Sequence, residues 1–356
     1  MKSFFSFLSG FFQVLYFFVF LLTIAGFFAP YFSVKDFPPL QLFALFFLAF
    51  LPFHLIAFFI FSEKKKILRS LALLAFLMSG WVGLKEINYA EWEQDKKNEL
   101  RVLSYNVENF GYNQYKQNQI LAFIKQKHPD VVCFQEFCAW NRIRPGKDTQ
   151  IFAEKIAKEL GLPHFVFPSG STHITNIAIF SKYPITKIDT LFLHKTVPNS
   201  GLITTIDSPW GLVGIGNLHL TSFNVNQLKK EYAFYDRFFP ALYKRWVEVL
   251  TEQEEKVSIV KYAIESYPNP LILVGDFNAP PHSRVVTQIS DRMSDGFREK
   301  GVGKGWTYPF HVTGVKLGIR IDYQFHNEKV HTLDYRTYPL KYADHYPVLG
   351  IYRMLR

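Results

Sequence analysis

The stretch "LILVGDFNAP", residues 271–280, runs four apolar residues directly into a glycine, an aspartate and an asparagine. A short apolar run of this kind is typical of a strand buried in a sheet. Asp, Asn, Gly and Pro also favour turns, so a turn alone would explain any one of these residues. The alternative is that a rigid strand end holds polar groups at a reactive centre. Asp276 and Asn278 are two apart, so they project to the same side if the extended conformation continues.

Polar residues recur at the ends of other apolar, strand-like runs. Taken singly, each has an ordinary interpretation as a turn residue, a helix cap, a buried core histidine or a surface carboxylate. Together they predict one site assembled from several strand ends. They are Asn106 after "LSY", Glu136 after "VVCFQ", Asn217 and His219 in "GLVGIGNLHL" (211–220), Asp322 in "RIDYQF" (320–325), and Asp344 with His345 before "YPVLGIY".

Strand-like and helix-like stretches alternate over residues 100–356, which predicts a single α/β domain built on packed sheets. The segment 85–99 is polar and charged and is predicted to be a linker. Helical periodicity is found in 115–127, 148–160 and 225–267. The predicted strands are 101–107, 131–136, 176–181, 202–207, 211–220, 271–276, 320–325 and 345–353.

The first 84 residues have a different composition, because they hold 21 of the 38 phenylalanines. Three apolar runs, at 4–32, 38–61 and 67–84, predict a membrane anchor of about three transmembrane helices. A two-span or re-entrant arrangement is the alternative. A cleaved signal peptide is disfavoured because the first run is far longer than the apolar part of such a peptide.

Lysine and arginine placement predicts the orientation of these helices. The connection "SEKKKILR" (62–69) holds four of the six basic residues in the first 84, so it is predicted to be cytoplasmic. Three spans then place everything after about residue 85 outside the cytoplasm. In a bacterium this describes a multi-pass inner-membrane protein with a periplasmic domain.

The net charge and the cysteine content exclude few classes of partner or site. Six basic and two acidic residues in the first 84 leave +6 of the net +10 for residues 85–356, which is compatible with polyanionic or membrane-surface partners. Cys133 and Cys138 are too distant to bridge if that stretch is extended, and two thiols make a poor metal site.

The motifs "SYNV", "QE", "NLHL", "GDFN", "RIDY" and "DHYPV" stand in an order that resembles the endonuclease/exonuclease/phosphatase superfamily. That superfamily includes deoxyribonuclease I-like nucleases, abasic-site endonucleases, inositol polyphosphate 5-phosphatases and secreted sphingomyelinases. The resemblance covers about residues 100–356. It implies a four-layer α/β sandwich with two central mixed sheets and metal-dependent hydrolysis of phosphate esters.

The resemblance implies that Glu136 is a metal ligand with Asn106 beside it. Asp344 is then expected to lie on the side of the metal or of the attacking water. Oxygen ligands without thiols favour Mg²⁺, with Mn²⁺ or Ca²⁺ as alternatives. Asp276 is expected to position or deprotonate the attacking water, and Asn278 to hold a phosphate oxygen.

His345 is expected to bind the scissile phosphate. Asp344 is its neighbour and points to the opposite face in extended chain, so Asp322 is the better partner for His345, and the family pairs its histidine in this way. His219 is expected to be a second phosphate contact or an acid.

Two asparagines are expected at the substrate. Asn217 lies on the same strand face as His219, and Asn176 either faces the site or has a strand-edge role.

This chain departs from the family pattern in two ways. Ala343 precedes Asp344 where many relatives have serine, and the tryptophan-cysteine-aspartate-arginine signature of the inositol polyphosphate 5-phosphatases is absent.

The substrate stays open between nucleic acid and a phospholipid or other phosphorylated head group, and an inactive binding domain is a third alternative. No dense basic stripe of the kind that tracks a phosphate backbone is present. The aromatic and basic stretch 223–250 is either a helix packed on a sheet or a surface that touches the bilayer. No protein partner can be inferred.

Overall fold

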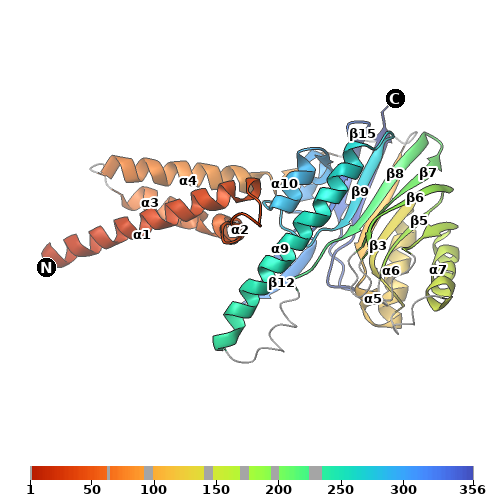
Figure 1. The fold of residues 1–356 in the computed structure, drawn as a ribbon, viewed down its shortest axis with the longest axis horizontal. Coiled ribbons are helices and arrows are strands. Elements are labelled where there is room, and N and C mark those ends of the chain that lie inside the picture. The colour runs from red at the N-terminus through yellow and green to blue at the C-terminus, as the bar shows by residue number, and fades with distance from the viewer. Residues whose placement is uncertain are drawn as a thin grey trace. The chain divides into compact units, whose positions relative to one another are not determined.

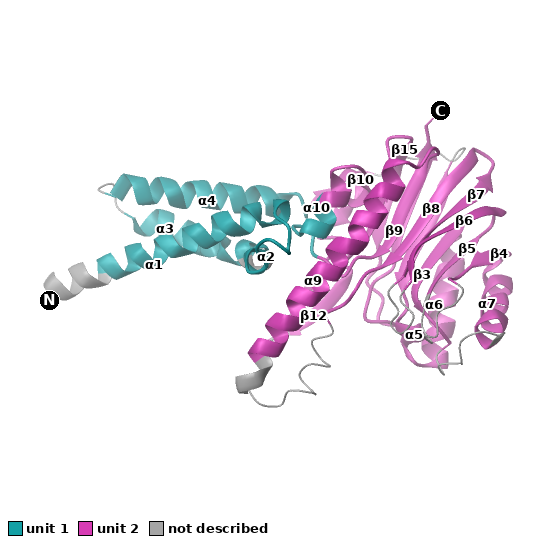
Figure 2. Cartoon of the chain, viewed as in Figure 1, with its two compact units in different colours: residues 1–87, 280–287 teal, residues 88–279, 288–356 magenta. Residues whose placement is uncertain are grey.

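The computed structural model describes residues 2–61, 65–91, 99–139, 147–168, 176–193, 200–223 and 235–355. Internal contacts divide the chain into two compact units (Figure 2). Unit 1 comprises residues 1–87 and 280–287, and unit 2 comprises residues 88–279 and 288–356.

Two six-stranded sheets form the centre of unit 2 (Figure 1). Each is mixed, because one neighbouring pair in each sheet is parallel and the other pairs are antiparallel. Sheet I has the order β10 (Ser294–Asp295), β14 (Asp322–His326), β9 (Leu271–Asp276), β8 (Gly211–His219), β7 (Ser200–Ser208), β6 (Ile185–Leu193). Sheet II has the order β15 (Val330–Thr337), β16 (Val348–Met354), β2 (Leu100–Asn106), β3 (Val131–Phe137), β5 (Asn176–Ser181), β4 (His164–Val166).

Two short antiparallel pairs accompany these sheets. In one, β1 (Asn88–Tyr89) pairs with β11 (Val302–Gly303), so part of the predicted linker is structured. In the other, β12 (Tyr308–Val312) pairs with β13 (Val315–Ile319). The linker residues 92–98 lie outside the described part of the chain.

The two sheets pack face to face through alternate residues of their strands. Val102 and Cys133 of sheet II share a buried cluster with Ile272 and Val274 of sheet I. The other face of sheet II carries Leu103 and Phe134 and is covered by α6 (Gln114–Lys127) and α7 (Lys147–Leu160). On the side of sheet I lies α9 (Tyr235–Glu265) (Figure 1). The short α11 (Gly296–Lys300) contacts β14 of sheet I and β15 of sheet II. The predicted four-layer α/β sandwich with two central mixed sheets is therefore confirmed.

Unit 1 is helical. Its order is α1 (Lys2–Phe28), a 3₁₀ turn (Ala29–Tyr31), α2 (Leu40–Phe46), a second 3₁₀ turn (Phe47–Phe50), α3 (Leu51–Ile60) and α4 (Lys66–Leu84). Residues 280–287, which include the start of α10 (Arg284–Ser290), belong to the same unit. Small residues at the contacts, such as Ala57 and Ala72, let these helices approach closely.

Two helical stretches among the described residues, Ser9–Tyr31 and Lys66–Leu84, are long and apolar enough to cross a membrane. The middle apolar run, predicted as one span over 38–61, is instead divided into α2, a 3₁₀ turn and α3. Pro52 in the first turn of α3 cannot donate a helical hydrogen bond, which favours a helix start at this point. The ten residues of α3 rise only about 15 Å as a helix, roughly half of a bilayer's hydrocarbon core.

Candidate active site

Three neighbouring strands of sheet I bring three predicted site residues into one row. Asp276 ends β9, the parallel neighbour β8 ends beside it at His219, and the antiparallel neighbour β14 begins beside it at Asp322. His219 and Asp322 are both paired in register with Asp276. The apolar strands therefore fix the backbone positions of all three residues.

Asp276 lies at the centre of the group and is 1% exposed. Its Oδ2 accepts a hydrogen bond from Asn106 Nδ2 of sheet II at 3.0 Å. The same oxygen lies 3.7 Å from His219 Nε2 and 3.6 Å from His345 Nε2. One buried carboxylate oxygen thus faces two imidazoles, neither of which is within hydrogen-bond distance.

His345 is held by a different carboxylate. Its Nδ1 lies 2.9 Å from Asp322 Oδ2, which is the pairing predicted from the sequence. The loop before β16 is not extended as expected, since the strand starts only at Val348. Even so, the side chain of Asp344 does not pair with His345, and its backbone N–H donates to Glu108 Oε2 at 3.2 Å.

Glu136 reaches the group from sheet II because β3 is irregular there. Between Phe134 and Phe137 β3 has one residue more than its partner β5, which is a β-bulge. Glu136 has a φ of +51°, a conformation that costs free energy in a residue other than glycine. Its Oε1 lies 3.5 Å from Asn106 Nδ2 and 3.9 Å from His219 Nε2.

Burial shapes the proton affinities of this group. It raises the pKa of Asp276 to about 6, with a further increase from Asp322, while His345, His219 and the Asn278 N–H act in the opposite direction. Burial by itself lowers the pKa of His345, but Asp322 and Asp276 outweigh it and hold that pKa well above 6.5. At neutral pH the structure therefore pairs an imidazolium with carboxylates.

Glu108 is a site residue that the sequence analysis missed. Burial raises its pKa, and the nearby carboxylates Asp344 and Glu136 raise it further. It follows Asn106 by two, the spacing that drew attention to Asp276 and Asn278, so the signal was present in "SYNVENF". Its backbone is left-handed, with a φ of +46°.

The donor chemistry fits a hard divalent cation. Glu108, Glu136 and Asp344 offer carboxylate oxygens whose negative charges oppose one another, and a bound cation would relieve that repulsion. A second group, Asp276, Asp322 and His345, also has ligand atoms within 4.8 Å of one another. We favour the first set, because in the second the imidazolium already compensates the carboxylates.

Two of the predicted site residues are hydrogen-bonded to backbone groups in the structure. Asn217 is fully buried, and its amide donates to Phe134 O and Ala178 O at 2.9 and 3.1 Å and accepts from Gln135 at 2.7 Å. It ties the two sheets together, two residues deeper than His219, and is not placed to contact substrate.

Asn278 does not continue the strand, since its φ is +48°. Its side chain donates to Leu220 O at 3.0 Å and its N–H donates to Asp276 Oδ1 at 2.8 Å. The chain is therefore not extended at Asn278, so the condition for its projection beside Asp276 is not met. Asn278 supports the loop, and its contact with a phosphate oxygen stays a prediction. Asn176 begins β5, but its side chain lies outside what the structure describes.

Tyr308 is a further residue that the sequence did not single out. Its ring lies against His345, with centroids 5.0 Å apart. It comes from β12, a strand of the short hairpin that carried no catalytic-type motif.

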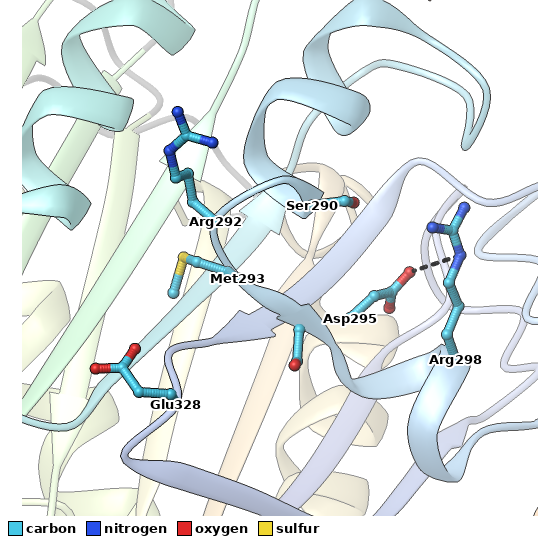
Figure 3. Close-up of a pocket in the computed structure, with 7 residues that line it drawn as sticks. Ser290, Arg292, Met293, Asp295, Arg298 and Glu328 are labelled. Carbon is cyan, nitrogen blue, oxygen red and sulfur yellow. Dashed lines mark ion pairs between the residues drawn. The ribbon is translucent and has the colours of Figure 1, made fainter.

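A hollow of about 330 Å³ lies elsewhere in unit 2 and contains none of the predicted site residues. Figure 3 shows its polar lining, in which Arg298 Nε lies 3.7 Å from Asp295 Oδ2. The lining is Ser290, Arg292, Met293, Ser294, Asp295, Arg298 and Glu328. The cluster around Asp276, where strand ends, shifted pKa values and strained backbone coincide, is the better candidate for chemistry.

Comparison with known proteins gives a consistent result. Residues 103–345 match the profile of the endonuclease/exonuclease/phosphatase family. No curated protein matches the chain.

Several solved structures are similar in fold. An endonuclease/exonuclease/phosphatase from Beutenbergia cavernae DSM 12333 is 19% identical, with 73% of this chain and 72% of that chain covered and a TM-score of 0.51. A family protein from Leptotrichia buccalis C-1013-b is 15% identical over 70% and 98%, with a TM-score of 0.52. D. rerio TDP2, solved with a single-strand DNA product, is 14% identical over 73% and 100%, with a TM-score of 0.51.

Proposed function

This chain belongs to the endonuclease/exonuclease/phosphatase family, and from that premise we propose that it is a divalent-metal-dependent phosphoesterase that hydrolyses phosphodiester bonds of nucleic acid. The observation that carries the proposal is the buried Asp276 carboxylate, which has a raised pKa and faces His219 and His345. Such an arrangement supplies a base and two positively polarised groups at one point, as phosphate ester hydrolysis requires.

Each residue has a distinct task in this proposal. Asp276 takes the proton of the attacking water, because a pKa of about 6 leaves it ionised yet basic at neutral pH. His345, charged and oriented by Asp322, stabilises the negative charge that builds up on the phosphate oxygens. His219 is a second donor to the phosphate or to the leaving oxygen.

Glu136, Glu108 and Asp344, with Asn106 beside them, would hold the metal. The ion, Mg²⁺ or alternatively Mn²⁺ or Ca²⁺, supplies charge neutralisation at the phosphate when it is bound.

Nucleic acid is the proposed substrate because D. rerio TDP2, which has a similar fold, was solved with a single-strand DNA product. The positive net charge outside the first 84 residues is compatible with a polyanion.

One observation favours a phospholipid substrate as the second candidate. In α9, Phe239 and Tyr243 are 61% and 43% exposed, although Trp246 is buried. Exposed aromatic residues next to Lys244 and Arg245 are typical of a surface that touches the bilayer interface. Residues 224–234 of the same aromatic stretch lie outside the described part of the chain.

The test is a parallel assay of the detergent-solubilised full chain with Mg²⁺ against DNA, RNA, phospholipid vesicles and a simple phosphomonoester. Cleavage of DNA or RNA that EDTA abolishes and Mg²⁺ restores supports the proposal. Cleavage of the vesicles alone supports the second candidate. Metal-dependent binding of these compounds without any turnover would leave the inactive binding domain as the remaining alternative.

We also propose that the helices of unit 1 anchor the protein in a bacterial inner membrane with unit 2 outside the cytoplasm. The side depends on the basic connection 62–69, because Lys66–Leu84 crosses directly after it and exits on the opposite side, whether or not the divided middle run also crosses. An alkaline phosphatase fusion after the last residue should be active, with a green fluorescent protein fusion at the same point as the control. An inactive alkaline phosphatase fusion together with a fluorescent green fluorescent protein fusion would overturn this topology.

A further inference from the structure

Two loops leave the same end of sheet I, each directly after a strand that ends in a residue of the proposed site. One follows β8 and contains Thr221, two residues after His219. The other follows β9 and contains Asn278, two residues after Asp276. The spacing of His219 and Asp276, whose polar atoms lie 3.7 Å apart, depends on how these loops are held.

A single side chain of α9 reaches both loops. Gln253 is fully buried, and its Nε2 donates to Thr221 O at 2.7 Å and to Asn278 O at 3.2 Å. A primary amide nitrogen carries two hydrogens, so it can serve two carbonyls at once. Neither carbonyl belongs to a regular strand, so the amide takes the place of a ladder partner at this edge.

A lysine one turn further along α9 strengthens the same link. Lys256 is 9% exposed, and its Nζ donates to Thr221 Oγ1 at 2.9 Å while pairing with Glu252. Gln253 and Lys256 are three apart, so they lie on one face of the helix. The loop after β8 is therefore held at both its backbone and its side chain.

The loop after β9 has more need of such support. Asn278 is held at a φ of +48°, a sparsely populated region for residues other than glycine, even though asparagine tolerates it best. Its conformation also determines the direction of its backbone N–H, which donates to Asp276 Oδ1 at 2.8 Å. Loss of the partner of Asn278 O would let the loop relax and change the setting of the carboxylate.

We propose that Gln253 is a positioning residue for the reaction, which joins the His219 and Asp276 loops and fixes the distance between the two groups. Lys256 assists it through Thr221. The inference rests on the proposed function for its kinetic consequence, but the link between the loops can be measured without activity.

The experiment compares Gln253→Met with a matched variant, Gln324→Met. Gln324 is also fully buried, and its amide donates to two backbone carbonyls, Val102 O at 3.3 Å and Val348 O at 2.9 Å, which lie deeper between the sheets. Both substitutions remove an amide that bridges two buried carbonyls, so both should lower the melting temperature. Only Gln253→Met should lower kcat, by about 10- to 100-fold with KM changed little, because misplaced catalytic groups slow the chemical step.

Hydrogen exchange supplies the second readout on the same full-length proteins. Gln253→Met should speed exchange at the amides of Leu220 and Asn278, which donate to Asp276, and leave the amide of Leu349 in β16 unchanged. Unchanged exchange at Leu220 and Asn278 would overturn the link even if the wild type proved inactive. A kcat equal to that of the wild type, or a loss no greater than that in Gln324→Met, would overturn the positioning role.

Discussion

Unit 2 contains two clusters of buried charge, which differ in how completely the buried carboxylate is paired with a cation. In the first, Arg320 NH1 donates to both carboxylate oxygens of Asp295 at 3.0 and 2.7 Å. The guanidinium also lies 4.6 Å from the ring centroids of both Phe297 and Tyr323. This ion pair is almost completely satisfied, which is the condition under which buried charges are tolerated.

In the second cluster the carboxylate is left incompletely compensated. Asp276 is equally buried, yet its nearest imidazole nitrogens are 3.6 and 3.7 Å away and its hydrogen bonds come from neutral amides. Its pKa is consequently raised to about 6. The comparison teaches that a fully paired buried carboxylate holds structure, whereas a partly paired one stays available for proton transfer.

Replacement of the proposed base should give the largest effect. Asp276→Asn keeps the size of the side chain and removes the proton acceptor, so kcat should fall by about 10²- to 10⁴-fold. The melting temperature should not fall, since a buried, incompletely paired charge is removed. Turnover close to that of the wild type, in the presence of Mg²⁺, would show that the second cluster is structural like the first.

Breaking the ion pair between Arg320 and Asp295 in the first cluster should lower stability and leave the rate of the reaction unchanged. Arg320→Met removes the buried cation that binds both carboxylate oxygens of Asp295 and leaves Arg298, whose Nε lies 3.7 Å away. This loss should cost about 3–5 kcal/mol in the free energy of unfolding. Urea unfolding measures this cost, and kcat per folded molecule should stay unchanged. The double variant Arg320→Met/Asp295→Leu should recover part of the loss. A lowered kcat with normal stability would instead assign the pair to the active site.

The orientation of His345 should have an intermediate effect. Asp322→Asn removes the carboxylate that accepts from Nδ1 and that raises the pKa of the imidazole. We expect kcat to be about a hundredfold lower. We also expect the imidazolium of His345 to lose its proton at a lower pH than in the wild type. NMR titration of the imidazole in both proteins measures this, and an unchanged titration would remove Asp322 from the role.

The pH dependence should give the smallest change over the accessible range. Because Asp276 must be ionised, kcat/KM should fall about tenfold per pH unit below its pKa of about 6. The raised pKa also means that the folded state binds this proton more tightly than the unfolded state. Its contribution to stability is therefore lost as pH rises from about 4 to 6. The residual activity of Asp276→Asn should lack the acidic limb, and a wild-type profile that is flat from pH 5 to 7 would contradict the assignment.

Much of the fold could be predicted from local pattern. The runs at 101–107, 131–136 and 271–276 are apolar enough to be strands in any context, and they form β2, β3 and β9 with shifts of one residue at most. β6 and β15 were missed because each carries several polar and partly exposed residues that blur the apolar signal. The middle apolar run of unit 1 was predicted as one helix, since hydropathy does not report where a 3₁₀ turn interrupts it.

The site was predictable where strand ends alone place a side chain, as at Asp276, His219 and Asp322. Prediction failed where the backbone leaves the extended conformation. Alternation along a strand cannot anticipate the left-handed backbone at Asn278, nor can it show that Asn217 lies between the sheets with its amide fully engaged. Glu108 was missed although its spacing from Asn106 offered a signal, because its left-handed backbone lies beyond the strand end and cannot be predicted from the sequence.

The extra residue in β3 has a genetic consequence. Phe134 and Phe137 are three apart and yet stack in the same core, with ring centroids 5.5 Å apart, only because of that extra residue. A three-nucleotide deletion that removed Gln135 would place Phe134 and Phe137 two apart, which keeps both on the same face, but it would remove the irregularity that brings Glu136 to the site. Such an in-frame deletion is therefore expected to leave the contact between the two phenylalanines intact and to withdraw the Glu136 carboxylate from the site.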